Sequence, residues 1–281
     1  MSAKSRQWLP ILVGLAAALL PMPAQAQFRT VTDDGWCNRD RDGDWSDRDN
    51  QHYCEVREAV LPAAARISVD ATPNGGIKVE GWDRGEIRVR AKVTAGARGD
   101  MEAARAMASE VRIETASTIR AEGPQTSHRS YWSVSYQISV PRRSGLSLRS
   151  HNGGISIAGV NGEIDFETTN GGVTLAGLSG QVKGRTTNGG LTVRLAGTEW
   201  SGDGLDAQTT NGGVTLAVPE GYNAHLEAST VNGGMNIDFP VTVQGNLRRS
   251  LSVDLGRGGR PIQVSTTNGG VSVRRKMTTR D

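Results

Sequence analysis

The stretch TTNGGVTL, residues Thr168–Leu175, returns almost unchanged along the chain and decides the fold. It stands again as TTNGGLTV from Thr186, as TTNGGVTL from Thr209 and as TTNGGVSV from Thr266. The tripeptide NGG begins at seven positions: Asn74, Asn152, Asn170, Asn188, Asn211, Asn232 and Asn268. From Asn152 onward the intervals are 18, 18, 23, 21 and 36 residues, so we interpret the last interval as two coils of which one has lost its NGG. A recurring period of about 20 residues is typical of stacked repeat proteins.

Apolar and polar residues alternate on both sides of each NGG. Three residues after the Asn, six repeats have an apolar side chain: Ile155, Val173, Leu191, Val214, Met235 and Val271. A period of two predicts β-strands with one buried face, and the longer period predicts that each strand lies over the one before it. We therefore predict an all-β fold, a parallel β-solenoid with coils of about 18 residues, right-handed by the usual crossover preference.

The NGG corner has a predicted structural role. Glycine after asparagine permits the left-handed backbone that a sharp turn needs, and we expect the seven asparagines to stack their amides as a corner ladder. The Thr two residues before most of these asparagines is expected to form a second ladder. Opposite charges would then lie in register, with Asp165 beside Lys183 and Glu167 beside Arg185, which favours this pairing over a shifted one.

The composition divides the chain into five segments. The first has basic residues, then an apolar stretch, then small residues up to Ala26, which predicts a cleaved secretory signal peptide. A helix is expected from about Asp100, which can serve as its N-cap. The predicted segments are the signal peptide at 1–26, an acidic leader at 27–64, an irregular β cap with one short helix at 65–145, the regular NGG solenoid at 146–274 and a basic tail at 275–281.

Cysteine content and charge agree with export. Cys37 and Cys54 are the two cysteines of the chain, and an even pair in an oxidising compartment predicts one disulfide. Removing the signal peptide lowers the net charge from +3 to +1, because it carries two positive side chains and no negative one. Such a nearly neutral chain gives no reason to expect nucleic acid as a partner. No other apolar stretch in the sequence is long enough to span a membrane after signal cleavage.

The order of these motifs resembles a bacterial family of "putative adhesins". The resemblance rests on NGGIKVEGWDRGEIRV from Asn74, a short helix, VPR at Val140–Arg142, HNGGISI and the TTNGG series, and it covers roughly Ala65 to Val273. The segment CEVRE, Cys54–Glu58, is also similar to the leader of some members. The resemblance implies an extracytoplasmic β-solenoid with surface attachment or envelope scaffolding as its role. It implies no catalytic residue.

The acidic leader raises the question of a metal site. Asn38, Asp40, Asp42, Gly43 and Asp49 fall at positions 1, 3, 5, 6 and 12 of an EF-hand-like calcium loop. Position 1 is Asn, position 12 is Asp rather than Glu, and three arginines lie among the carboxylates and oppose a cation. Calcium binding by the leader is therefore one alternative, and a solvated loop with internal salt bridges is the other.

Catalysis is a further alternative, in the form of a polysaccharide-active β-helix enzyme. Glu163, Asp165 and Glu167 form an outward acidic row, and carboxylate pairs are what glycoside hydrolysis needs. Lys183 and Arg185 are expected beside two of them, which favours a surface that sets register. The four histidines are scattered, and the sequence has no GxSxG motif. We predict no catalytic residue.

The sequence thus predicts an exported, non-catalytic β-solenoid with an adhesin-like or envelope scaffold role, in the periplasm or at the cell surface. Its expected partner is a cell-envelope component, either a glycan or a protein surface, and end-to-end self-association stays open. Trp200 lies on a five-residue insertion and is the favoured ligand contact if a local site exists, but an aromatic side chain in such a place more often covers the solenoid flank. No cofactor is expected apart from the calcium alternative.

Overall fold

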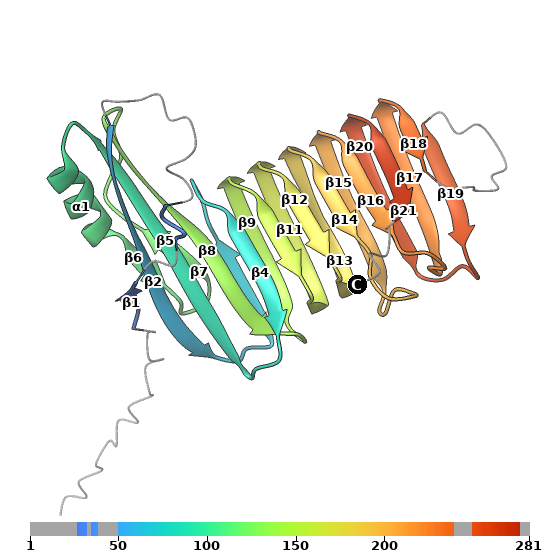
Figure 1. Ribbon diagram of the computed structural model, residues 1–281, viewed down its shortest axis with the longest axis horizontal. Helices are drawn as coiled ribbons and strands as arrows, with labels where there is room; N and C mark the ends of the chain where they lie inside the picture. The colour runs from blue at the N-terminus through green and yellow to red at the C-terminus, as the bar shows by residue number, and fades with distance from the viewer. Residues whose placement is uncertain (1–26, 33–34, 39–49, 239–248, 276–281) are drawn as a thin grey trace, which may run out of the picture.

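Two large β-sheets and one helix make up the computed structural model, which describes residues 27–32, 35–38, 50–238 and 249–275 (Figure 1). The prediction of an all-β fold with one helix is confirmed for these residues. The signal peptide and the basic tail beyond Arg275 lie outside them. The helix α1 (Met101–Glu110) has ten residues, and the described chain holds no helix long and apolar enough to cross a membrane.

The strands fall into sheet A and sheet B. Sheet A has eleven strands, in the order β1 (Arg29–Val31), β2 (Asn50–Pro62), β5 (Glu86–Arg98), β8 (Ser130–Pro141), β4 (Ile77–Trp82), β10 (Ile155–Ala158), β12 (Val173–Ala176), β14 (Leu191–Arg194), β16 (Val214–Val218), β21 (Val271–Arg275) and β18 (Met235–Ile237). Sheet B has ten strands, in the order β19 (Ser250–Leu255), β17 (Ala224–Asn232), β20 (Pro261–Asn268), β15 (Gly204–Asn211), β13 (Ser179–Asn188), β11 (Asn161–Asn170), β9 (Gly145–Asn152), β3 (Arg66–Asp70), β7 (Ile119–Glu122) and β6 (Arg112–Glu114).

Each NGG turn carries the chain from a strand of sheet B to a strand of sheet A, and neighbouring coils pair in parallel. Asn170 pairs with Asn188 in sheet B, and Val173 pairs with Leu191 in sheet A, as the columns of the sequence predict. The stack begins earlier than the predicted boundary at residue 146. The strands β3 and β4 already form a coil in register with β9 and β10, so the irregular cap consists of the strands beyond β3 and β4 together with α1.

The last coil of the chain is not at the end of the stack. The strands β20 and β21 lie between β15–β16 on one side and β17–β18 on the other. The interval of 36 residues therefore does not contain a lost coil, which corrects the sequence interpretation. Instead, β19 pairs antiparallel with β17 at the edge of sheet B, and the chain then returns to fill the space between two earlier coils (Figure 1).

The core lies between the two sheets and is built from stacked apolar columns. The column three residues after each Asn is buried from Ile155 to Val271, and only Met235 at the end of the stack is half-buried. Burial of such a side chain stabilises the fold by about 1.5–3 kcal/mol. The Thr ladder is also buried, and the hydroxyl of Thr186 donates to the carbonyl oxygen of Gly171 at 2.8 Å, with the same bond in its neighbours.

The glycines of the NGG corner differ from the sequence expectation. Both glycines have negative or extended φ at six of the seven corners, and Gly269 alone has a φ of 157°, so the corner does not depend on left-handed backbone. Left-handed glycines occur instead where the sheet A strands end, at Gly159 (φ 64°) and Gly177 (φ 56°). The first NGG glycine is needed for another reason: a Cβ at Gly171 would lie 2.2 Å from the carbonyl oxygen of Gly153.

Candidate ligand-binding surface

The outer face of sheet A is a flat strip of small side chains. Four residues after each Asn, the solenoid strands present a hydroxyl side chain in five neighbouring coils: Ser156, Thr174, Thr192, Thr215 and Ser272. Glycine lies two residues before this column in all five coils, and alanine lies two residues after it in three of them, whereas Arg194 and Arg274 take that place in the other two. The backbone of sheet A is therefore open to a ligand along much of the solenoid.

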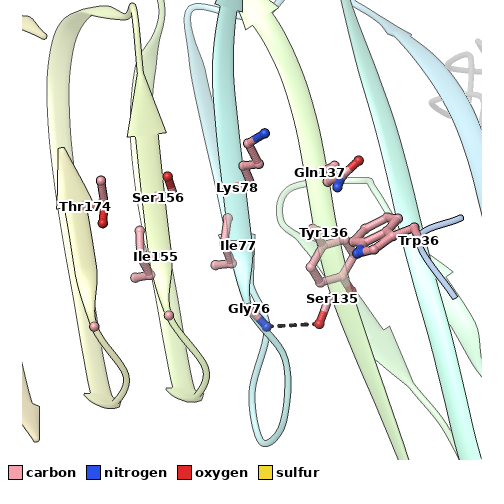
Figure 2. Close-up of a pocket in the computed structure, with 12 residues that line it drawn as sticks. Trp36, Gly76, Ile77, Lys78, Ser135, Tyr136, Gln137, Ile155, Ser156 and Thr174 are labelled. Atoms are coloured by element: carbon pink, nitrogen blue, oxygen red, sulfur yellow. Dashed lines mark hydrogen bonds between the residues drawn. The ribbon is translucent and has the colours of Figure 1, made fainter. Parts of the chain in front are cut away.

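A hollow of about 360 Å³ lies on this face where the solenoid meets the cap. Trp36 lines one side of it, and the hydroxyl side chains of Ser156 and Thr174 lie across from Trp36 on β10 and β12 (Figure 2). Lys78 on β4 and Gln137 on β8 line it between these two sides (Figure 2). The hollow thus combines one aromatic ring with a floor of small polar groups.

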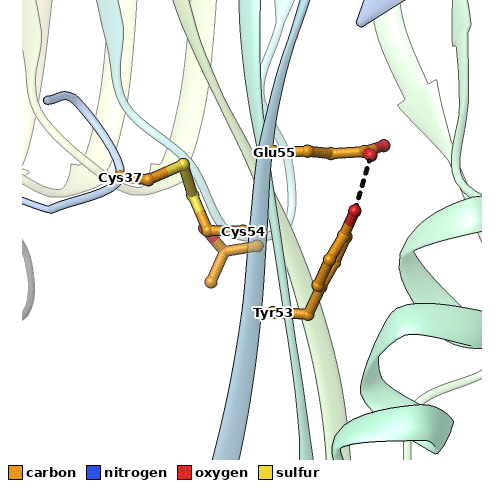
Figure 3. The surroundings of a disulfide bond; sticks show 5 residues. Cys37, Tyr53, Cys54 and Glu55 are labelled. Atoms are coloured by element: carbon orange, nitrogen blue, oxygen red, sulfur yellow. Dashed lines mark hydrogen bonds between the residues drawn. A yellow bond between two sulfur atoms is a disulfide. The ribbon is translucent and has the colours of Figure 1, made fainter. Parts of the chain in front are cut away.

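Trp36 is held against the sheet at two places. The neighbouring Cys37 forms a disulfide with Cys54 on β2, which is the predicted pairing (Figure 3). The indole ring also contacts two cations of β5, with the Arg90 Cζ atom at 5.6 Å and the Lys92 Nζ atom at 5.4 Å from the ring centroid. Lys92 is only 8% exposed. A ring fixed in this way loses little conformational freedom when a ligand binds.

The polar groups of the hollow differ in their existing partners. The Ser135 hydroxyl accepts a hydrogen bond from the Gly76 backbone N–H at 3.2 Å (Figure 2). The Lys78 ammonium lies 2.7 Å from the Glu80 carboxylate. The hydroxyls of Ser156 and Thr174 form no hydrogen bond with another residue of the described chain, and both residues are half-buried. These two hydroxyls can therefore bond a ligand without breaking an internal bond.

A second hollow, of about 410 Å³, lies on the outer face of sheet B and is lined by charged side chains of both signs. Arg66 pairs with Glu163 at 3.2 Å and with Asp165 at 2.5 Å. Glu167 pairs with Arg185 at 2.6 Å, as the register predicts. The acidic row considered for catalysis is thus neutralised by arginines, and Arg66 was not identified as a partner from the sequence.

The structure joins the seven NGG asparagines into a continuous ladder. The Nδ2 group of Asn170 donates to Oδ1 of Asn152 at 2.8 Å, and the Nδ2 group of Asn188 donates to Oδ1 of Asn170 at 2.8 Å. The remaining rungs have the same geometry, at 2.8 or 2.9 Å, in the order Asn74, Asn152, Asn170, Asn188, Asn211, Asn268 and Asn232. These side chains bond to one another, so they are structural.

Trp200 packs against the flank of the solenoid, which is the more common of the two roles weighed from the sequence. Its side chain is 6% exposed, and its indole N–H donates to the carbonyl oxygen of Gly180 at 2.9 Å. The insertion therefore covers the flank of the solenoid.

Of the predicted calcium ligands, Asn38 is exposed in the structure, whereas Asp40, Asp42 and Asp49 lie outside the described residues, so calcium binding stays a prediction.

Sequence reasoning missed Trp36 and also a polar cluster at the far end of the solenoid. His225 on β17 bonds through Nδ1 to the Asp254 carboxylate on β19 at 2.7 Å. Its Nε2 lies 3.4 Å from the Glu227 carboxylate and 3.3 Å from the Ser252 hydroxyl. The hydrogen bond with Asp254 raises the pKa of His225 above its usual 6.5. Trp36 could have been noticed because it directly precedes a half-cystine; the spacing of His225 and Asp254 carries no such signal.

Comparison with known proteins finds one matching family model and several similar solved structures. A family model described as Toastrack DUF4097 matches residues 62–274. A solved structure of a putative cell adhesion protein from Clostridium sporogenes ATCC 15579 is similar, with 12% identity and a TM-score of 0.42 over 81% of this chain and 100% of that one. A putative adhesin from Bacteroides fragilis NCTC 9343 has 10% identity and a TM-score of 0.34 over 80% and 97%. A putative lipid binding protein from Parabacteroides distasonis ATCC 8503 has 10% identity and a TM-score of 0.29 over the same shares. No curated protein matches the sequence.

Proposed function

Since the chain belongs to the Toastrack DUF4097 family, we propose that it is an exported, non-catalytic binding protein of the bacterial envelope with an adhesin-like role. In this proposal the hollow beside Trp36 holds a glycan. Support for export comes from the Cys37–Cys54 disulfide, because structural disulfides persist in oxidising compartments and are rare in the cytosol. Fractionation of cells would distinguish a periplasmic protein from one at the cell surface.

The observation that carries the proposal is the fixed indole of Trp36 on one side of the hollow and, across from it, hydroxyls that have no hydrogen-bond partner among the described residues. A sugar ring has an apolar face that packs on an aromatic ring and hydroxyls that bond polar groups. Ligand sites commonly combine aromatic side chains with a few well-placed polar groups in a volume of about 300–1,000 Å³. The hollow, with Trp36, Ser156 and Thr174, has this composition and is large enough for a short stretch of glycan.

The shape of the surface favours a polymer over a small metabolite. The hollow is open, and the hydroxyl column continues beyond it along neighbouring coils. The neutralised carboxylates on sheet B support a non-catalytic role, since Glu163 and Asp165 both bind Arg66. Hydrolysis of a polysaccharide by the protein, lost on Glu163→Gln, would instead assign the enzyme alternative.

The proposal is tested by binding of cell-wall glycans and an array of bacterial oligosaccharides to the mature protein. The variant Thr174→Val removes a hydroxyl inside the hollow, and Thr215→Val removes the equivalent hydroxyl of the same column outside it. Loss of one hydrogen bond of about 0.5–1.5 kcal/mol predicts a loss of affinity of roughly 2- to 13-fold for Thr174→Val. For an oligosaccharide no longer than the hollow, we expect no change for Thr215→Val and a larger loss for Trp36→Ala.

Trp82→Ala is the matched control for the aromatic ring. Trp82 is a half-buried tryptophan that also contacts arginines, and it does not line the hollow. Equal weakening by Trp36→Ala and Trp82→Ala, equal weakening by the two threonine variants, or no glycan bound by the wild-type protein would each contradict the proposal.

A further inference from the structure

The position of the C-terminal coil creates a slot that another chain can fill. The strands β20 and β21 are the last described strands of the sequence, yet each pairs with an earlier coil on both of its sides. In sheet B, Ile262 lies between Leu205 and Leu226. Without β20 and β21, the coils β15–β16 and β17–β18 would leave a space one coil wide between them.

The two walls of this slot bond the inserted coil through groups that every NGG coil has. Asn268 donates to Asn211 at 2.8 Å and accepts from Asn232 at 2.9 Å. The Thr266 hydroxyl donates to the carbonyl oxygen of Gly212 at 2.8 Å. These bonds depend on the sequence of the inserted coil and not on the chain to which it is attached. A copy of the coil from a second molecule would make them all.

Charge prevents the slot from closing on itself. Gln263 of β20 lies between Asp206 of β15 and Glu227 of β17, and its side-chain amide donates to Glu227 at 2.9 Å. If β17 paired directly with β15 in the same register, Asp206 would lie directly beside Glu227. Like charges opposed across neighbouring strands destabilise their pairing. The empty slot is therefore better filled by another copy of the coil than by collapse.

A glycine-rich connection allows the coil to move. Five residues, 256–260, join β19 to β20, and Gly256, Gly258 and Gly259 have φ values of 56°, 75° and 149°. Glycine adopts these and other backbone conformations at little cost. We propose that the slot between β15–β16 and β17–β18 is a self-association site, which accepts the β20–β21 coil of a second copy of this chain in exchange for its own. Exchange of an identical element between protomers is a low-cost route to oligomers.

Cysteine trapping in the full-length mature protein tests the exchange. Thr215 on β16 and Ser272 on β21 are paired residues on neighbouring strands, about 4.8 Å apart, which a disulfide can bridge. Thr215→Cys and Ser272→Cys are made in separate chains, mixed, warmed to the onset of unfolding, cooled and oxidised. We expect a disulfide-linked heterodimer, because the β21 strand of one chain enters the slot of the other.

Two controls distinguish exchange from collision and from misplacement of the coil. A mixture of Thr192→Cys with Ser272→Cys has its cysteines two strand spacings, about 9.6 Å, apart in the exchanged dimer and is not expected to crosslink. The double variant Thr215→Cys, Ser272→Cys is expected to close within one unheated chain. No heterodimer despite closure of the double variant, equal heterodimer in both mixtures, or no closure of the double variant would overturn the proposal. The result does not depend on glycan binding.

Discussion

The two glycines of each NGG corner have different steric surroundings. A Cβ on the first glycine would lie 2.2 Å from the Gly153 carbonyl oxygen at Gly171, and 2.1 Å from the Gly171 oxygen at Gly189. On the second glycine, Gly172, the nearest atom would be the Gly190 oxygen at an ordinary 3.5 Å. The first glycine is therefore fixed by the close approach of the neighbouring backbone, and the second leaves the outer face of sheet A flat.

This difference predicts that replacement by alanine lowers the stability of the fold much more at the first glycine than at the second. Gly171→Ala forces two backbones apart in the middle of the ladder, so we expect the free energy of unfolding to fall by about 1–3 kcal/mol or more. Gly172→Ala has room and no left-handed φ, so we expect a change within about 0.5 kcal/mol, or slight stabilisation through the unfolded chain. Urea denaturation of both variants measures the difference. Similar losses at both positions would contradict the steric account.

At the scale of single elements, β19 is the strand whose attachment depends on charge. Among the described strands it lies at the edge of sheet B and pairs only with β17, and this pairing places His225 opposite Asp254 and Glu227 opposite Ser252. A protonated imidazole can donate to both carboxylates, whereas the neutral ring has only one N–H. Protonation of His225 therefore strengthens the attachment of this edge strand.

The attachment of β19 should weaken as the pH rises. The pKa of His225 in the folded protein is above its unfolded value of 6.5, chiefly because of the hydrogen bond with Asp254, with smaller contributions from Glu227. Its stabilisation is therefore fully present below about pH 6.5 and is lost as the pH rises through the folded pKa. The side chain is 37% exposed, so solvent screening limits the effect to about 0.2–1 kcal/mol.

Hydrogen exchange of the β19 amides between pH 6 and 9, corrected for intrinsic rates, should show this loss in the wild type and not in His225→Gln. The same pH dependence in both proteins would rule out His225 as the cause.

At the scale of the whole molecule, local pattern determines the register but not the order of the coils. The columns of apolar, Thr and Asn residues correctly predicted which residues face each other, as Asn170 and Asn188 do. They could not predict that β20 lies between β15 and β17, because all three strands have interchangeable columns.

The hollow could not be predicted from the sequence either, since it exists only where a disulfide places Trp36 over strands distant in the chain. The hydrogen-bond partner of Trp200 could not be named from the sequence, because it is a backbone carbonyl, which no side-chain pattern reveals.

The stacking order also predicts how stability is distributed along the chain. β21 pairs with β16 over five residues and with β18 over three, whereas β18 has only one neighbour among the described strands. In a stack where each coil contacts only its neighbours, local opening starts at the end of the stack, here the end of the described strands, and proceeds inward. We therefore expect native-state hydrogen exchange to open β18 and β19 before β20 and β21, although β20 and β21 come later in the sequence. The strands β11 and β12, which have a neighbouring coil on both sides, give the reference for an interior coil. Exchange that starts at β20 and β21, as at a frayed chain end, would mean that their place between two earlier coils is not held in solution.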